Sequence, residues 1–186
     1  MADPRCFGDG DAPTERYHDD EWGRPERDET RLFEALSLEG LQSGLAWRTI
    51  LHRRDGIREA FHGFDPERVA RMGRRDVDRL MHDARVIRHR PKLEAIAGNG
   101  RATLALRDGE TLPALVWRHQ PGPRPAPRTW DDVATAPEAR ALAKELKRHG
   151  FAFVGPTTVY ALMQAAGLVN DHLASCPARR AVEALA

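Results

Sequence analysis

The sequence has few cysteines, no long apolar run and no strand pattern, and each absence excludes a class of protein. Two cysteines in 186 residues, Cys6 and Cys176, exclude a disulfide-rich scaffold. No stretch is apolar enough to span a membrane, and the first five residues lack the basic and apolar regions of a signal peptide. We therefore expect a cytoplasmic protein with no membrane association. Its length suits a single domain over residues 1–186 with a core of its own.

Internal repeats are also missing, and the periodicity that remains is helical. After an irregular first part, apolar spacing predicts helices over residues 30–39, 48–61, 76–84, 88–106, 158–166 and 178–185. Asp65-Pro66 opens another, and a capping box over residues 135–138 opens one that ends at Gly150. Gly98 and Gly100 are expected to loosen the helix over 88–106. A proline-rich segment near 121–128 is predicted to link two helical lobes of an all-α protein.

Glu39 is a carboxylate at a position where the helical pattern calls for an apolar residue. It follows Leu32 and Leu36 at positions i, i+4 and i+7, so the three side chains share one interior face. An unpaired buried carboxylate costs several kcal/mol or gives up its charge, so Glu39 needs a partner. On the local pattern alone, a salt bridge to one of the many arginines is the commoner outcome. A cationic or amine-bearing ligand would serve as well.

Aromatic residues gather around this carboxylate in the sequence. Tyr17 and Trp22 precede Glu39 and Trp47 follows it, so three of the six Trp and Tyr residues lie in one short stretch. Electron-rich ring faces beside a buried anion suit a flat cation such as an alkylated purine, because each face adds roughly 0.5 to 2 kcal/mol. Taken one at a time, such rings are more often ordinary core aromatics. As a group they indicate a site.

Five ordered segments resemble the constitutive 3-methyladenine DNA glycosylase I family of bacteria. They are spread along nearly the whole length of the chain and are Tyr17–Gly23, Leu38–Trp47, Ile87–Leu93, Gly150–Thr158 and Met163–His172. The resemblance implies a helix-hairpin-helix glycosylase fold with a structural zinc and no organic cofactor. It also implies a monomer that acts on double-stranded DNA and removes 3-methyladenine by hydrolysis of its N-glycosidic bond, leaving an apurinic site.

This resemblance gives the residues around Glu39 their expected roles. Glu39 would accept hydrogen bonds from the amino edge of the flipped base and complement its positive charge. Tyr17, Trp22 and Trp47 would form the pocket walls, with Trp47 stacked on the purine, and Leu45 of the Gly44-Leu45 turn would fill the gap left in the DNA. The family lacks the catalytic aspartate of its fold relatives, and residues 155–158 supply none. No lysine is evident as a Schiff-base nucleophile.

Cysteine and histidine residues at the two ends of the chain form a candidate metal site. Cys176 follows His172 by four residues, which puts both side chains on one side of a helical turn, and Cys6 and His18 lie near each other in sequence. Alone this is a weak signal. The resemblance implies that all four bind one structural zinc that ties the N-terminus to the C-terminus. A disulfide between Cys6 and Cys176 is the alternative, which a reducing cytosol disfavours.

Charge is distributed unevenly along a chain whose net charge is only +1. Residues 1–30 hold four Arg against ten Asp and Glu, whereas residues 67–101 hold ten Arg and Lys against five. A basic stripe on a nearly neutral protein can still supply phosphate contacts. The helices over 76–84 and 91–106 are therefore predicted to form a DNA-binding hairpin whose phosphate contacts come from Arg88, Arg90 and Lys92. The alternative without a DNA-binding role is a helical hairpin whose basic face is simply solvated.

The sequence departs from the family at two positions. Arg85 stands where the family has a glycine that opens the hairpin turn, so either this turn needs no positive φ or DNA binding is weaker. Gly8 stands where the family has a tryptophan that forms one wall of the base pocket, two residues after Cys6. Either Phe7 replaces that wall, or the pocket admits bulkier N3 adducts. Two further readings stay open: a zinc-stabilised protein that binds alkylated DNA without excising the base, and a binder of free methylated purines.

Overall fold

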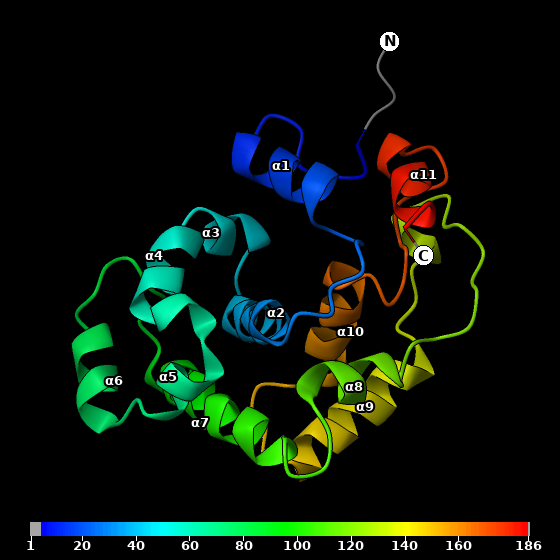
Figure 1. Cartoon of the computed structure of the whole chain (residues 1–186). Helices are drawn as coiled ribbons and strands as arrows, with labels where there is room; N and C mark the ends of the chain where they lie inside the picture. Colours follow the sequence, from blue (N-terminus) through cyan, green and yellow to red (C-terminus); the bar gives the residue numbers. More distant parts are fainter. Residues whose placement is uncertain (1–4, 186) are drawn as a thin grey trace.

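The computed structural model describes residues 5–185, which form helices joined by loops and contain no strand (Figure 1). The all-α prediction is confirmed. Within these residues, no helix is both long enough and apolar enough to cross a membrane. The α-helices are α1 (Ala12–Asp20), α2 (Glu29–Gln42), α3 (Trp47–Leu51), α4 (Arg54–Ala60), α5 (Pro66–Ala70), α6 (Arg74–Leu80), α7 (Arg90–Leu106), α8 (Leu112–Trp117), α9 (Pro137–Arg148), α10 (Pro156–Ala165) and α11 (Pro177–Glu183). Two short 3₁₀ helices are η1 (His62–Phe64) and η2 (Trp130–Asp132).

Helix α2 lies at the centre of the molecule, with the other helices around it (Figure 1). It contacts α3, α7, α8 and α10. Its apolar residues recur on more than one face, so it is buried on most sides. The carboxylate of Asp28 caps the helix by accepting a hydrogen bond from the backbone N–H of Arg31. This central position explains how Glu39, on α2, comes to lie in the interior.

Three features of the helices differ from the sequence-based predictions. Helix α1 was not predicted, because it buries only Thr14, Tyr17 and His18 and so shows little apolar periodicity. Helix α8 was not predicted either. The predicted helix over 48–61 is wrong, since α3 and α4 are separated at residues 52–53.

Two local predictions about helix ends and glycines are also wrong. No capping box opens α9, because its N-cap is Ala136, which has no capping side chain; Pro137 instead sets the first helical φ. Gly100 does not loosen α7, which runs unbroken over seventeen residues. A Cβ at Gly100 would lie 3.0 Å from the backbone nitrogen of Ala70, so glycine allows α5 to pack closely on α7.

Candidate active site and metal centre

Glu39 is buried, with 6% of its surface exposed, as the sequence predicted. Within residues 5–185, no side chain forms a salt bridge with it and no donor forms a hydrogen bond to its carboxylate. The alternative prediction, a salt bridge between Glu39 and an arginine, is therefore wrong. Burial raises the pKa of the Glu39 carboxyl to about 8. The group is thus a desolvated acid that gains its charge most readily beside a cation.

Aromatic rings line a cavity of 380 Å³ at this carboxylate. The rings of Tyr17, on α1, and Trp47, the first residue of α3, have centroids 5.1 Å apart. Trp22 lies on the same cavity and packs edge-on against Phe7. Chain segments on both sides of α2 therefore bring together the three aromatic residues that the sequence singled out. Such a cavity suits a flat ligand with a positive charge.

The indole N–H of Trp47 is a second buried polar group on this cavity. Its Nε1 atom has no hydrogen-bond partner among the described residues. Buried donors and acceptors are nearly always paired, so an unpaired donor next to an unpaired carboxylate indicates that a ligand satisfies both. A larger cavity of 640 Å³ also reaches Glu39. That cavity is lined by Arg54, whose guanidinium is paired with Glu34 and Glu21, so Arg54 is not free to pair with Glu39.

The turn that follows α2 holds an apolar side chain in solvent. Helix α2 ends at Gln42, which lines the aromatic cavity. Gly44 then adopts φ +79°, and the N–H of Leu45 donates to the carbonyl of Gln42. Leu45 is 40% exposed and is one of four large apolar residues in the described chain that lie open to solvent. The turn therefore presents Leu45 between Gln42 and Trp47, which both line the cavity.

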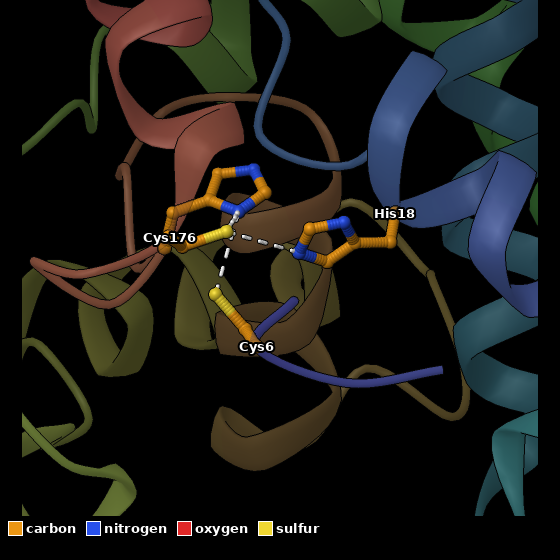
Figure 2. A group of neighbouring side chains, drawn as sticks. Cys6, His18 and Cys176 are labelled. Atoms are coloured by element: carbon orange, nitrogen blue, oxygen red, sulfur yellow. Dashed lines mark hydrogen bonds between the residues drawn. The ribbon is translucent and has the colours of Figure 1, made fainter. Parts of the chain in front are cut away.

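The four predicted metal ligands come together, although they lie at opposite ends of the sequence. One ligand atom from each of Cys6, His18, His172 and Cys176 lies within 4.8 Å of every other. The Cys176 sulfur lies 3.5 Å from Nε2 of His18 and 3.6 Å from Nδ1 of His172. The Cys6 sulfur also lies 3.6 Å from Nδ1 of His172, and both thiols are free. Figure 2 shows Cys6, His18 and Cys176 pointing toward a common centre.

The second ring nitrogen of each histidine is held by an oxygen acceptor. Nε2 of His172 donates to the carbonyl of Trp22 at 3.1 Å, and Nδ1 of His18 donates to the carboxylate of Asp19 at 2.8 Å. Metal-binding histidines are oriented in this way. Burial also lowers the pKa of His172 to about 4, which favours the neutral imidazole that binds metals. The cluster therefore has the donor set and the orientation of a metal site.

The three predicted phosphate contacts occupy different environments. Arg88 is exposed and forms no ion pair within the described part of the chain. Arg90 is paired with Asp78 at 2.7 Å. Lys92 is buried, and its ammonium donates to the carbonyls of Leu41 and Ser43 at the end of α2. We therefore correct the interpretation of Lys92: two of its three N–H donors are used inside the protein rather than on DNA.

The structure also shows how the chain accommodates Arg85 and Gly8, the two residues that depart from the family pattern. Arg85 is not among the residues with positive φ in the described chain, so the hairpin turn needs no glycine there. Its guanidinium turns back to Asp83 and Glu59. Phe7 packs edge-on against His18 and Trp22, on the metal side of the cavity. Trp130, which sequence reasoning did not single out, lines the cavity as well. It lies 83 residues beyond Trp47, in η2 after the proline-rich segment, so no local pattern connects it to the site.

Taken together, these features define a helical protein with an aromatic pocket around a buried acid and with a separate Cys₂His₂ cluster. The family model for methyladenine glycosylases matches residues 8–180. The chain belongs to this family. It is 50% identical over 165 residues to DNA-3-methyladenine glycosylase 1 of Escherichia coli K12, an alignment that covers 86% of this chain and 88% of that protein.

Solved structures agree with this assignment. A crystal structure of a 3-methyladenine DNA glycosylase I superimposes with a TM-score of 0.90 at 45% identity, over 94% of this chain and 98% of that one. A structure of the Staphylococcus aureus enzyme, which describes recognition of 3-methyladenine, has a TM-score of 0.88 at 38% identity. It covers 94% of this chain and 95% of its own.

Proposed function

We propose that this protein hydrolyses the N-glycosidic bond of 3-methyladenine in DNA and leaves an apurinic site. The observation that carries the proposal is the buried, unpartnered carboxylate of Glu39 on an aromatic cavity. A DNA-binding module needs neither the cavity nor the cost of burying an acid. A cationic base that enters the cavity supplies the missing counter-charge and stacks on Trp47.

Selection of the damaged base follows from charge. 3-Methyladenine in DNA carries a positive charge, whereas unmodified adenine is neutral. Only the cation lowers the cost of ionising Glu39, whose pKa is about 8 without a ligand. Every 1.4 kcal/mol of binding free energy that the neutral base lacks relative to the cation gives about tenfold selectivity. Flipping also costs less for a damaged base, because its pairing in the duplex is weaker.

The chemistry requires little acid or base assistance. The bond between C1′ of the sugar and N9 of the base breaks, and its electron pair neutralises the cationic purine as it leaves. Water adds its oxygen to C1′ and loses a proton to the solvent. Glu39 holds the base, and its carboxylate stabilises the positive charge that moves from the purine to the sugar as the bond breaks. Gly155–Thr158, at the start of α10, supplies no carboxylate to serve as a general base.

The DNA would be held by the Gly44-Leu45 turn and by the hairpin formed by α6 and α7. Leu45 is exposed and would fill the space left by the flipped nucleotide. Arg88 would contact a phosphate next to the N-terminus of α7, whose unpaired amides favour an anion. We assign α6, α7 and their connecting turn to the helix-hairpin-helix of the superfamily. The protein would act as a monomer with a single domain.

We further propose that the Cys₂His₂ cluster binds a structural zinc. Tetrahedral zinc, with Zn–N of about 2.0–2.1 Å and Zn–S of about 2.3 Å, places its nitrogen and sulfur ligands about 3.5 Å apart. The sulfur of Cys176 lies at that separation from both histidines. Four protein ligands leave no open position, so the ion would take no part in hydrolysis. It would fix the segment that carries Tyr17 and Trp22.

Base release from methylated duplex DNA tests the proposal. Wild type should release free 3-methyladenine without added nucleotide and leave alkali-labile sites in an otherwise intact strand, as measured by chromatography and gel analysis. Undamaged DNA of the same sequence is the control. If the protein binds methylated DNA but releases no base from methyl or larger N3 adducts, it is a binding module and the glycosylase assignment is withdrawn.

A further inference from the structure

The proline-rich segment between α8 and α9 does not behave as a free linker. The guanidinium of Arg124 donates to the hydroxyl of Tyr160 and to the carbonyl of Ala134, both at 2.9 Å. The N–H of Ala174 donates to the carbonyl of Pro127 at 2.8 Å. These bonds fasten the segment to α10 and to the loop between the ligands His172 and Cys176. A side chain on this segment therefore has a fixed position relative to the candidate active site.

Trp130 is the side chain that this segment presents. The carboxylate of Asp132 accepts hydrogen bonds from the backbone N–H groups of Arg128, at 2.8 Å, and Thr129, at 2.9 Å, and so fixes the turn that carries Trp130. The indole N–H of Trp130 donates to the carbonyl of Cys6 at 3.3 Å. Even so, 43% of the surface of this residue is exposed. A large aromatic held in place and left open to solvent is typical of a binding surface.

The ring of Trp130 lies on the cavity that contains Glu39. Its centroid is 6.2 Å from that of Phe7 and 6.2 Å from that of Trp22. Trp130 therefore extends the row of aromatic rings from the metal centre toward solvent. Trp130 is also the most exposed of these three aromatic residues.

Residue 8 cannot provide this wall. Gly8 has φ +99°, a conformation that side-chain-bearing residues rarely adopt. A Cβ at Gly8 would lie 3.0 Å from Cγ2 of Thr14 and 3.1 Å from its carbonyl carbon, so α1 would have to move. Phe7, for its part, is packed against His18 and Trp22. Among the described residues that line this cavity, Trp130 is the aromatic with the most exposed surface.

We propose that Trp130 forms the outer wall of the base pocket and limits the size of the N3 substituent that fits. This inference rests on the proposed function of the same site. The ring closes the aromatic cavity over the flipped purine and fills the side that residue 8 leaves open. Trp130 contributes to binding of the flipped base and to specificity for the size of its N3 substituent, whereas Glu39 complements the charge of the base.

Two substitutions at Trp130 distinguish the contribution of the aromatic ring from that of its hydrogen bond to Cys6. Trp130→Ala removes the wall, and Trp130→Phe keeps a ring but loses the N–H bonded to Cys6. We expect Trp130→Ala to lower kcat/KM for duplex DNA containing 3-methyladenine by roughly 5- to 30-fold, the range expected for loss of base stacking. The loss should be smaller for a 3-ethyladenine duplex, because the wider mouth admits the larger group. Trp130→Phe should stay within about threefold of wild type on both.

Trp117→Phe is the matched control. Trp117 lies on α8, and its indole N–H donates to the carbonyl of Glu26, away from the cavity. This variant should match wild type on both duplexes. Metal content and the midpoint of thermal unfolding, measured for every variant, show whether Trp130→Ala acts by disturbing the neighbouring Cys6. An equal loss of metal and activity would overturn the proposal, and so would Trp130→Ala activity within twofold of wild type on both duplexes.

Failure of this inference differs from failure of the proposed function. If wild type releases no base, the glycosylase assignment fails. Calorimetric titration of free 3-methyladenine then still decides the role of Trp130. The proposal requires at least fivefold weaker binding by Trp130→Ala than by wild type, and equal binding would overturn it.

Discussion

The ammonium of Lys92, on α7, donates a hydrogen bond to the carbonyl of Ser43, one residue before the Gly44-Leu45 turn. A second bond runs from the same nitrogen to the carbonyl of Leu41 at 2.8 Å. The last carbonyls of a helix lack intrahelical partners and carry partial negative charge, so a buried cation is favourable there. Lys92 thus joins α7, in the proposed DNA-binding hairpin, to the turn that carries Leu45.

Replacing Lys92 with methionine should therefore reduce both stability and activity. The substitution keeps the length of the side chain but leaves two buried carbonyls unpaired, at a cost of about 1 to 3 kcal/mol each. We expect a lower midpoint of chemical unfolding and slower release of 3-methyladenine. The dependence of DNA affinity on salt should not change, since Lys92 does not face phosphate. Lys144→Met, at an exposed position on α9, is the matched control and should resemble wild type. A reduced salt slope for Lys92→Met would restore the phosphate interpretation.

Arg88 should behave in the opposite way. It is exposed and unpaired within the described chain, so Arg88→Ala removes a phosphate contact without breaking an internal bond. Affinity for damaged and undamaged duplexes should fall by the same factor, and the slope of log K against log salt should decrease by about 0.9. Fluorescence anisotropy between about 50 and 200 mM salt measures both quantities. Arg140→Ala, exposed on α9, should leave the slope unchanged. An unchanged slope for Arg88→Ala would place the hairpin away from the DNA.

The sequence predicted what short-range patterns and chemical type determine. The spacing of Leu32, Leu36 and Glu39 along one helix face was enough to predict that Glu39 is buried. The residue types of Cys6 and His172, together with the family resemblance, were enough to predict that the two cysteines and two histidines come together. In both cases the information lies in the residues themselves.

Contacts between segments far apart in the chain could not be predicted in this way. A lysine in a basic stretch looks like a phosphate contact, and only the fold shows that Lys92 reaches carbonyls some fifty residues earlier. The same holds for Trp130, whose place in the cavity depends on bonds from Arg124 and Ala174. Helix α1 escaped prediction because its buried face includes polar Thr14 and His18, which bind to other groups rather than follow an apolar pattern.

The metal centre should hold the two ends of the chain together. We expect about one zinc per chain, and we expect Cys6→Ser and His172→Ala each to lower metal content and thermal stability in parallel, because binding a structural zinc contributes directly to folding. Plasma emission spectrometry and calorimetry measure the two quantities. Ser43→Ala, at a polar residue outside the cluster, serves as the control and should keep the metal. A fully folded, metal-free wild type with oxidised cysteines would contradict the zinc proposal.

The burial of Glu39 should make the protein less stable as pH rises. Its pKa in the folded state is about 8, above the value of 4.5 for a free side chain. Below about pH 4.5 the folded and unfolded states are both protonated and the group has no effect. Between these values only the unfolded state ionises, which favours unfolding by about 1.4 kcal/mol per pH unit. Glu39→Gln should therefore unfold at a higher temperature than wild type at pH 8 and at nearly the same temperature at pH 4. Equal stability at both pH values would mean that Glu39 is not desolvated.

The same ionisation should control activity, with the opposite sign. The carboxylate form of Glu39 complements the cationic base, so kcat/KM for 3-methyladenine release should rise about tenfold per pH unit below pH 8 and level off above it. Glu39→Gln keeps the shape of the side chain but removes the charge. At pH 8 its activity should be roughly 10- to 100-fold lower, if the charge contributes on the order of 1.5 to 3 kcal/mol in the transition state, and its pH profile should be flat. Trp47→Ala should lose activity through stacking yet keep the wild-type pH profile. Binding to undamaged DNA should barely change in either variant, because phosphate contacts dominate there. A Glu39→Gln variant that keeps the rising profile would assign the pH dependence, and with it the recognition of charge, to another group.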